Sequence, residues 1–395
     1  MLHLAYFFDG ELPSRRAEAI QFLQTAAALL RADGAARVTV WSGPLRAPRA
    51  GWLRHYGLED EPRLRVREFY PAAGGRRPGA GAVAQALADG GGRVVAMSRG
   101  EAGIELARWL PAGLPWVMEV HRPSLATMRR PSAGGWRRPV AEARRRRAAR
   151  REGAALRRAD GVAWLTEAVR QELRERYSLN SAAEAVLHSG VAVSADGPGP
   201  RPMADDSEAV DVIYVGKLDE RKGVSTLVRA VAKLEGCRAA VVGGDAEQVA
   251  AYAELARGLG VEAGAIEWAG QVEPSAIGGW YRRARVGVCP LPAGRCAIAE
   301  RYTSPMKVLE MMSAGVPIVA SDLPSIRELL RDGETALLVP PDDPTALAEA
   351  VRRLGRDPGL AEALARRAGE AVKAYDWSRR AVRLRELLDA VAERC

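Results

Sequence analysis

The sequence predicts an α/β fold made of two doubly wound, Rossmann-like domains that face a central cleft. With 395 residues, the chain is too long for one ordinary hydrophobic core. Short apolar segments alternate with helical patterns in both halves, which is typical of parallel sheets covered by helices on both faces. Ligands of such sheets bind beyond the carboxyl ends of the strands, so two facing domains would share a cleft.

The first half holds five predicted strands and forms a predicted N-terminal domain, residues 1–195. After the first strand, a turn leads into a helix from residue 15 to about residue 31, with apolar side chains on one face. The predicted strands are residues 2–8, 37–43, 93–98, 116–120 and 161–166. Residues 196–208 hold three prolines and few apolar residues, which indicates an interdomain linker.

The second half forms a predicted C-terminal domain, residues 209–375, followed by a last helix, residues 376–395, expected to pack back across the cleft. Several helix starts combine Ser, Thr or Asp with a first-turn proline. The predicted strands are residues 211–216, 237–244, 265–270, 286–291, 316–321 and 336–340. The predicted helices begin near residues 223, 246, 274, 304, 324 and 344.

The composition indicates a cytoplasmic protein. No apolar stretch approaches the roughly 20 residues that span a bilayer, and the N-terminus lacks the basic region of a signal peptide. The four cysteines form no CxxC pair, so they are interpreted as thiols of a reducing compartment rather than as metal or disulfide sites.

Positive charge is concentrated in one segment. Residues 128–159 contain twelve arginines and two glutamates, Glu142 and Glu152, so this segment has a net charge of about +10. The whole chain has a net charge of +9, so the rest of the chain sums to about −1. A local basic surface from Arg129 to Arg158 could contact an anionic membrane at its inner face, or it could be a solvated helix face. No recognised nucleic-acid module accompanies the charge, so no nucleic-acid partner is predicted.

The segment VIYVGKLDERKG is a candidate anion site. A strand ends at Gly216, Lys217 follows its carboxyl end, and Lys222 opens the next helix, so two ammonium groups and free helix N–H groups would converge. Neither a P-loop nor a GxGxxG motif is present. Taken alone, the junction is also compatible with an ordinary loop.

The segment TSPMKVLE is the second candidate. Ser304 is expected to cap a helix whose first residue is Pro305. Glu310, further along the helix, could accept hydrogen bonds from a vicinal diol such as a ribose. Lys307 lies in the first turn, where its charge opposes the helix dipole, unless it is simply a solvated residue. Only five of the 58 basic residues are lysines, and three of these five fall in the two candidate segments.

The stretches VGKLDERKGVSTLVRA, IEWAGQV and RYTSPMKVLEMMSAGVPIVASDLPSIRELL resemble the donor domain of GT-B fold, retaining glycosyltransferases of the GT4 type. GKLxxxKG is similar to the family motif whose two basic residues bind the donor diphosphate, which implies that role for Lys217 and Lys222. SPMKVLE is similar to the end of the family's E-x7-E segment, which implies a ribose role for Glu310. The resemblance implies these donor-binding residues: Gly216, Val272, Tyr302, Ser304, Pro305, Met306, Lys307 and Glu310.

The first half resembles the acceptor domain of the same family. LPSRRAEAIQFLQTAAALL is similar to its first loop and helix, which places Ser14 and Arg16 on the acceptor side. VMEVHRPS resembles the strand that precedes an active-site histidine, so His121 is expected to hydrogen-bond the donor sugar. His188 lies near the family's turn before the linker and is interpreted as structural or as a wall of the cleft.

Two positions depart from the family pattern. Tyr302 stands where the first carboxylate of E-x7-E is expected, and this carboxylate lies near the transferred sugar in the family, so the sugar stays open. Lys217 replaces the commoner Arg, which keeps the charge but loses bidentate phosphate geometry.

The resemblance implies transfer of a hexose-like sugar from a UDP- or GDP-linked donor to an unknown acceptor hydroxyl, with retention of configuration. No cofactor and no metal are expected, because no acidic DxD cluster lies in a suitable place. Two alternatives remain: a sugar-nucleotide epimerase or hydrolase of the same architecture, and a non-catalytic partner subunit that uses the arginine surface.

Overall fold

The computed structural model describes residues 2–14, 17–69, 80–88, 93–128, 138–179, 183–193 and 208–394. The chain divides into two compact units, and the first is discontinuous in sequence. Unit 1 comprises Met1–His188 together with Trp377–Cys395, and unit 2 comprises Ser189–Asp376. The predicted linker, residues 196–208, lies outside the described residues except for Glu208.

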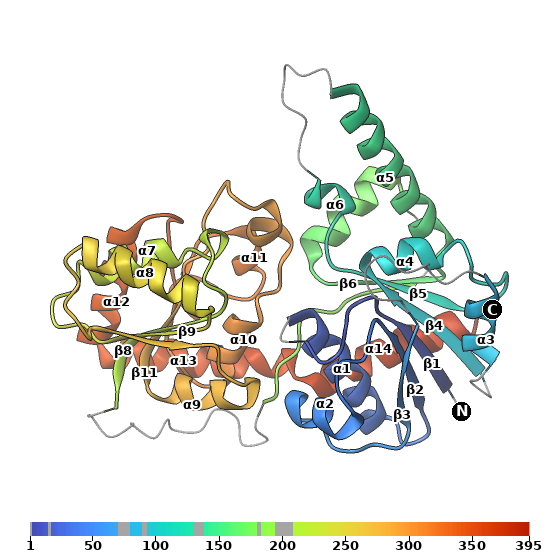
Figure 1. Ribbon diagram of the computed structural model, residues 1–395, viewed down its shortest axis with the longest axis horizontal. Helices are drawn as coiled ribbons and strands as arrows, with labels where there is room; N and C mark the ends of the chain where they lie inside the picture. The colour runs from blue at the N-terminus through green and yellow to red at the C-terminus, as the bar shows by residue number, and fades with distance from the viewer. Residues whose placement is uncertain are drawn as a thin grey trace. The chain divides into compact units, whose positions relative to one another are not determined.

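Unit 1 contains a seven-stranded parallel sheet in the order β3-β2-β1-β4-β5-β6-β7 (Figure 1). Strand β1 pairs with both β2 and β4, so the strand order reverses between β1 and β4. In open α/β sheets this reversal opens a crevice at the carboxyl ends of the strands, where ligands bind. The strands are β1 (Leu2–Phe7), β2 (Arg37–Ser42), β3 (Leu64–Glu68), β4 (Arg93–Arg99), β5 (Trp116–Val120), β6 (Gly161–Trp164) and β7 (Ala183–Val186).

Helices from both ends of the chain cover this sheet. The C-terminal helix α14 packs along α1 and against β6 and β7, so the last segment belongs to the core of unit 1 (Figure 1). Leu384 and Leu388 of α14 are fully buried in the cluster that holds Phe22 and Leu23 of α1. Burial of each such side chain contributes about 1.5–3 kcal/mol. The helices are α1 (Ala17–Ala32), α2 (Arg49–Tyr56), α3 (Ala80–Ala88), α4 (Gly100–Leu106), η1 (Ser124–Thr127), α5 (Arg138–Arg158), α6 (Glu167–Tyr177) and α14 (Trp377–Ala392).

Unit 2 contains a six-stranded parallel sheet in the order β10-β9-β8-β11-β12-β13. Strand β8 pairs with both β9 and β11, so the order reverses between β8 and β11. The strands are β8 (Val210–Val215), β9 (Ala239–Val242), β10 (Ile266–Gly270), β11 (Ala284–Cys289), β12 (Ile318–Ser321) and β13 (Leu337–Val339).

The helices of unit 2 bury one apolar cluster on each face of its sheet. Val212 and Tyr214 of β8 belong to one cluster, whereas the alternate residues Ile213 and Val215 belong to the other, as the two-residue period of a strand requires. The helices are η2 (Glu220–Lys222), α7 (Val224–Val231), α8 (Ala246–Gly258), η3 (Pro274–Ala276), α9 (Ile277–Arg282), η4 (Ile298–Tyr302), α10 (Met306–Ser313), α11 (Pro324–Arg327), α12 (Pro344–Arg356), α13 (Pro358–Val372) and η5 (Lys373–Tyr375).

The predicted α/β class with two doubly wound, Rossmann-like domains is confirmed, because both sheets are parallel and carry the Rossmann strand order. The prediction missed β3 and β7, which are the two edge strands of the unit 1 sheet. Strand β3 reads LRVRE and buries only Leu64 fully. An edge strand is covered incompletely, so its sequence lacks the apolar run that marks a central strand.

Candidate functional site

In unit 2, the reversal of strand order lies where Gly216 follows β8. Gly216 has φ of 147°, and a Cβ at this position would lie 2.7 Å from the Nζ atom of Lys307. Only glycine therefore allows the ammonium group of α10 to approach the backbone at the end of β8. The sequence segments around residues 216 and 307 thus meet at one point of the fold.

The following loop carries two further lysines. Lys217 is exposed and Lys222 is half-buried at the end of η2. The carbonyl of Lys217 accepts a hydrogen bond from the Tyr214 hydroxyl at 2.8 Å, and Asp219 caps η2 by accepting from the backbone N–H of Arg221 at 2.8 Å. The loop conformation is therefore held by its own hydrogen bonds, and both lysines belong to the segment that follows the carboxyl end of β8.

Gly223 fixes the junction between η2 and α7. Its φ is 73°, and a Cβ there would lie 1.6 Å from the carbonyl oxygen of Pro290, directly after β11. This contact joins the loops that follow β8 and β11, the two strands that flank the reversal. A side chain at position 223 would force the two loops apart, so Lys222 is held against this point of the sheet.

The start of α10 differs from the prediction. The helix begins at Met306, Pro305 occupies the N-cap position, and no side chain caps the helix, so the assignment of Ser304 as N-cap and Pro305 as first helical residue is wrong. The hydroxyl of Ser304 instead accepts a hydrogen bond from the backbone N–H of Ser189 at 3.1 Å, and the Ser189 hydroxyl donates to the Ser304 carbonyl at 2.9 Å. The first N–H groups of α10, those of Met306 and Lys307, have no carbonyl partner within the helix.

Lys307 is not a solvated residue. Its Nζ atom is buried 3.8 Å from the centroid of the Tyr214 ring, and it has no hydrogen-bond partner among the described residues. Burial lowers the pKa of this ammonium to about 8, and the charge of Lys222 lowers it further, while Cys289, Glu310 and Asp219 act in the opposite direction. A buried cation that lacks a hydrogen-bonding anion is a group prepared for an anionic ligand.

Glu310, one helical turn beyond Lys307, is half-buried and pairs with the buried Tyr281 of α9. The Tyr281 hydroxyl donates to Glu310 Oε2 at 3.3 Å. Burial raises the pKa of the Glu310 carboxyl, while the Tyr281 hydrogen bond and Lys307 oppose this rise. Burial and Glu310 also raise the pKa of the Tyr281 phenol, which therefore stays protonated and donates. The pair orients a carboxylate that can accept further hydroxyl hydrogen bonds.

The structure also locates the predicted donor residues Tyr302 and Val272. Tyr302 is a buried residue at the end of η4, so an aromatic ring rather than a carboxylate occupies this position. Glu300, two residues earlier, accepts from the backbone N–H of Gly294 at 3.0 Å. Val272, just after β10, is half-buried and packs against the apolar cluster of one sheet face.

In unit 1, His121 follows β5 beside the strand reversal. Its Nδ1 lies 3.0 Å from the Nη2 of Arg99, the last residue of β4, and therefore accepts a hydrogen bond. Its Nε2 carries the proton and lies 3.2 Å from Glu119 Oε1 without an aligned hydrogen bond among the described residues. Burial and the Arg99 charge lower the pKa of His121 to about 4. The imidazole is thus a neutral donor.

Glu119 is the centre of a buried polar network in unit 1. Tyr6 donates its hydroxyl to Glu119 Oε2, and Arg380 of α14 donates to Glu119 Oε1 at 2.7 Å. Burial alone would raise the pKa of the Glu119 carboxyl, but His121, Arg99 and Arg380 hold it below its ordinary range. Arg380 also donates to the carbonyl of His188 at 2.6 Å and to the Thr25 hydroxyl at 3.2 Å.

His121 and Arg99 line a pocket of about 210 Å³. Arg122 contributes a second guanidinium group, which lies 3.3 Å from the Glu18 carboxylate. The pocket therefore offers a neutral imidazole donor and two cations. Its other lining residues are Phe8, Asp9, Gly100, Ile104, Met118, Val120, Ser124, Thr127 and Glu152.

The other predicted residues of unit 1 lie elsewhere. Ser14 is half-buried, and its backbone N–H donates to the Tyr56 hydroxyl at 2.6 Å. Arg16 lies outside the described residues, as do Arg129, Arg130 and Arg137 of the basic segment. His188 is tied to Arg380 through its carbonyl, and burial lowers the pKa of its imidazole to about 4.

Four residues of these two sites were missed by the sequence reasoning: Glu119, Arg99, Arg380 and Tyr281. Glu119 does leave a signal, because it is a charged residue inside the apolar segment WVMEV of a central strand. A buried carboxylate in such a strand requires a partner. Its partner Arg380 lies 261 residues further along the chain, and no local pattern reveals that pairing.

Two features are absent from the described residues. No helix there combines the length and the apolarity that a membrane span requires. No three His, Cys, Asp or Glu side chains of the described chain converge in an arrangement able to hold a metal ion. The expectation that no metal takes part stays a prediction.

Sequence comparisons relate this geometry to known proteins. Residues 209–357 match the family model described as Glycosyl transferases group 1. The chain is 35% identical over 212 residues to the phosphatidyl-myo-inositol mannosyltransferase of Mycobacterium leprae, covering 52% of this chain and 53% of that protein. It is 27% identical over 241 residues to the D-inositol 3-phosphate glycosyltransferase of Streptomyces bingchenggensis, covering 56% and 51%. The chain thus spans about half the length of the curated relatives it matches.

Solved structures resemble the whole chain. Sucrose-phosphate synthase from Thermosynechococcus elongatus superposes with a TM-score of 0.74 at 21% identity, covering 100% of both chains. Anabaena Alr3699/HepE in complex with UDP superposes with a TM-score of 0.68 at 17% identity, covering 98% of this chain and 99% of that one. At these identities the likeness establishes the fold, which is GT-B.

Proposed function

We propose that this chain, whose residues 209–357 match the family model described as Glycosyl transferases group 1, transfers a hexose-like sugar from a nucleoside-diphosphate sugar to an acceptor hydroxyl. The observation that carries the proposal is the meeting of two lysines at the strand reversal of unit 2, where Lys307 Nζ lies against Gly216 and the charge of Lys222 lowers the pKa of Lys307. These two ammonium groups, the exposed Lys217 of the same loop and the free N–H groups of α10 suit a ligand with two phosphates. The Alr3699/HepE structure, which shares the fold, holds UDP.

In the proposed reaction, the bond between the anomeric carbon and the diphosphate oxygen breaks, and its electron pair leaves with the diphosphate. The acceptor oxygen forms a new bond to the same carbon from the same face, so configuration is retained. The acceptor proton passes to an oxygen of the departing phosphate. Lys217, Lys222 and Lys307 stabilise the charge that develops on this leaving group, which is electrostatic catalysis by preorganised donors. We assign no protein nucleophile.

Glu310 is proposed to bind the ribose hydroxyls of the donor. Its carboxylate is oriented by the Tyr281 hydroxyl, and it lies on the same helix as Lys307. Carboxylate acceptors suit a vicinal diol because each oxygen can accept one hydroxyl proton. His121, which lines the pocket of unit 1, is proposed to hydrogen-bond the transferred sugar. None of these proposed contacts involves the base, so they do not distinguish a UDP donor from a GDP donor.

For the acceptor we favour a hydroxyl of a phosphorylated inositol. Two relatives are named for inositol-containing substrates, a phosphatidyl-myo-inositol and an inositol 3-phosphate. The pocket of unit 1 that holds His121 also holds the guanidinium groups of Arg99 and Arg122, which suit a phosphate. Transfer to an inositol phosphate but not to inositol is expected with a radiolabelled donor. Equal transfer to both would contradict the role of these arginines.

The donor assignment is tested first by a thermal-shift panel of UDP, GDP, ADP and dTDP. The correct nucleotide stabilises the chain by mass action. The absence of any shift would favour a non-catalytic partner subunit, whereas release of free or epimerised sugar without acceptor would favour a hydrolase or an epimerase.

Lys222→Ala tests the diphosphate role. Loss of one preorganised cation at the leaving group should lower kcat by about 10²–10³-fold while circular dichroism stays unchanged. Lys233→Ala, an exposed lysine of the same unit, is the matched control. Wild-type turnover in the Lys222 variant would exclude this residue from the diphosphate site.

Glu310→Gln tests the ribose role. Replacement of a charged acceptor costs about 1–2 kcal/mol, so nucleotide affinity should fall roughly tenfold, measured by calorimetry. An unchanged affinity would count against a contact with the ribose.

We place this reaction in the cytoplasm. The described cysteines Cys237, Cys289 and Cys296 are free thiols, which persist in a reducing compartment. No cofactor or metal enters the proposed chemistry.

A further inference from the structure

Helix α5 (Arg138–Arg158) carries most of the basic segment, and its outer half, residues 139–151, buries no residue. Figure 1 shows α5 rising from unit 1, with its first turns beyond the other helices of that unit. None of the residues 139–151 is buried, and Val140 is 54% exposed. Burial begins only at Glu152. The outer half of α5 therefore contributes nothing to the core of unit 1.

The charge on α5 is not balanced by its own carboxylates. Nine of its residues are arginines and two are glutamates. Glu152 is buried and accepts from the Tyr177 hydroxyl at 2.7 Å and the backbone N–H of Ser124 at 2.6 Å. Glu142 lies 3.5 Å from Arg146 and Glu105 of α4 lies 3.9 Å from Arg151, so two carboxylates stand against the six arginines of residues 139–151.

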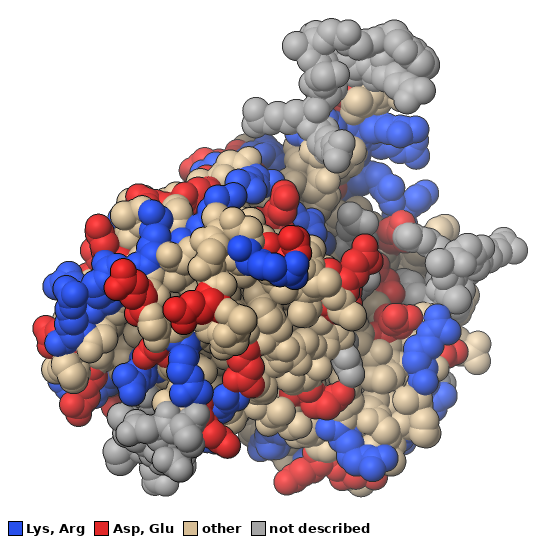
Figure 2. Space-filling view, turned by 60° about the vertical axis from the view of Figure 1, so that its left-hand side comes forward, with Lys and Arg blue, Asp and Glu red and all other residues tan. Residues whose placement is uncertain are grey.

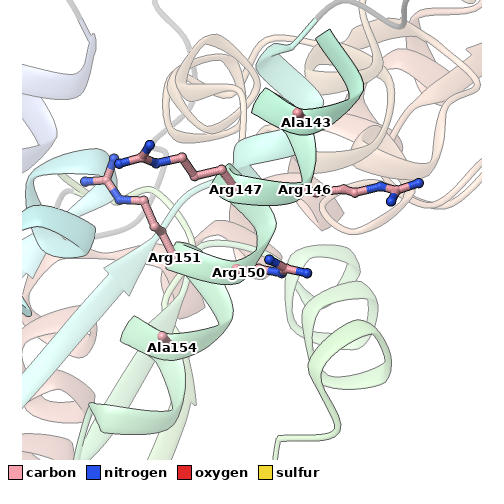
Figure 3. A pocket seen from close by; sticks show the side chains of 6 residues that line it. All are labelled: Ala143, Arg146, Arg147, Arg150, Arg151 and Ala154. Atoms are coloured by element: carbon pink, nitrogen blue, oxygen red, sulfur yellow. The ribbon is translucent and has the colours of Figure 1, made fainter. Parts of the chain in front are cut away.

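Four of these arginines border one shallow trough along the helix. Figure 3 shows Arg147 and Arg151 pointing to one side of α5 and Arg146 and Arg150 to the other side. Ala143 and Ala154 lie between them, because residues 11 apart return to nearly the same face of a helix. The trough has a volume of about 550 Å³ and a floor of methyl groups. Its guanidinium groups thus stand in two rows with room between them.

This arrangement is unfavourable for an isolated helix. The pairs Arg146–Arg150 and Arg147–Arg151 are four residues apart, and like charges at this spacing destabilise a helix by about 0.2–0.5 kcal/mol each. The outer half of α5 buries no residue, so it gains little from packing within its own unit. An anionic partner would remove the repulsion and supply the missing contacts.

Outside residues 128–159, the positive and negative charges of the sequence nearly balance. Figure 2 shows Lys and Arg interspersed with Asp and Glu over the visible face of unit 2, whereas basic side chains gather on the projecting part of unit 1. The segment of residues 128–159 carries about +10 while the remainder of the chain carries about −1. The anionic partner is therefore a local one and not a general polyanion.

We infer that the trough of α5 binds the phosphate groups of an anionic lipid bilayer, so that the chain works at a membrane surface. Guanidinium groups in two rows can each face a different headgroup, and the exposed Val140 at the end of the helix can enter the interface. Each basic residue close to an anionic bilayer adds about 1 kcal/mol of binding free energy, equivalent to about fivefold in affinity. The inference does not depend on the proposed donor chemistry.

The test is flotation of the full chain with two kinds of vesicle. One contains only phosphatidylcholine, and in the other about a third of the lipid is phosphatidylglycerol, enough for a negative surface potential. The fourfold variant Arg146→Gln, Arg147→Gln, Arg150→Gln, Arg151→Gln removes the charge but keeps good helix-forming residues. The matched control replaces four exposed arginines of α12 and α13 by Gln: Arg353, Arg356, Arg366 and Arg367.

We expect wild type and control to float with the anionic vesicles only, and salt to weaken this binding. The α5 variant should bind at least about a hundredfold more weakly, with unchanged circular dichroism and unchanged thermal shift by nucleotide. Equal binding of variant and control, or no binding of wild type to anionic vesicles, would overturn the inference. So would displacement of wild type from vesicles by a short DNA duplex at equimolar charge, since that would assign the surface to nucleic acid.

Discussion

Lys307→Met removes a buried cation while keeping the length of the side chain. The pKa of Lys307 falls from its ordinary value of 10.5 to about 8 because its Nζ is buried without a hydrogen-bond partner among the described residues. A difference of this size corresponds to a cost of about 3 kcal/mol for the charged form in the folded state. Below pH 8 the ammonium is charged in both states, so the whole cost is present. The wild-type chain without ligand should therefore be less stable than Lys307→Met at neutral pH.

The same difference in the pKa of Lys307 determines how the stability of the folded chain changes with pH. Between pH 8 and 10.5 the unfolded chain binds more protons than the folded chain, so Lys307 makes stability rise with pH in this window. The groups that face it are Cys289, Lys222, Glu310 and Asp219. Bound diphosphate would favour the ammonium and raise its pKa again. Nucleotide binding above pH 8 must then take up a proton.

The assay is calorimetry of nucleoside diphosphate binding in two buffers of different ionisation enthalpy. From pH 7 to pH 9 the protonated fraction of a group with a pKa near 8 falls by about tenfold, so the affinity of wild type should fall by about tenfold. Lys307→Met should bind more weakly at pH 7 but show no such fall. Lys233→Met, at an exposed position, should behave as wild type. An equal slope in wild type and Lys307→Met would refute the reasoning.

Two further predictions concern the packing of the sites. Gly223→Ala should lower the stability of unit 2 by more than about 2 kcal/mol, because the new Cβ would meet the Pro290 carbonyl. The control Gly236→Ala should cost only about 1 kcal/mol, because Gly236 has a φ of 65° but no atom within 4 Å of the Cβ position. Equal losses of stability in urea unfolding would contradict the tight contact at Gly223. Glu119→Gln leaves Arg380 buried without its counterion and should cost about 3–5 kcal/mol. If the double variant with Arg380→Met is no more stable than Glu119→Gln, the two residues do not act as a pair.

The central strands were predictable because their apolar character comes from burial on both faces. Strand β8 places consecutive apolar residues on alternate faces, and each face meets its own cluster. The edge strand β3 was missed because only Leu64 of its five residues is fully buried. A strand that is buried on both faces has a continuous apolar sequence, whereas an edge strand that is only partly buried does not.

The candidate site was predictable where its residues follow strand ends, and it was unpredictable where the contacts are long-range. Gly216 and Lys222 could be placed from the strand–loop–helix order alone. The capping of α10 was predicted wrongly because the hydroxyl of Ser304 bonds Ser189, 115 residues earlier. The burial of Lys307 above Tyr214 likewise depends on how two distant segments pack, which no local pattern records.

Helix α14 has a consequence for the order in which the chain can fold during synthesis. Unit 1 needs Leu384 and Leu388 to complete its core against α1, and these residues leave the ribosome after all of unit 2. Unit 2 is one uninterrupted stretch and can close as soon as it emerges, even though it comes second in the sequence. Until α14 is synthesised, an apolar face of unit 1 stays uncovered, which favours chaperone binding or aggregation. Arg380 reaches Glu119 only at that last stage, so the polar network around His121 is assembled only once the C-terminal helix has docked.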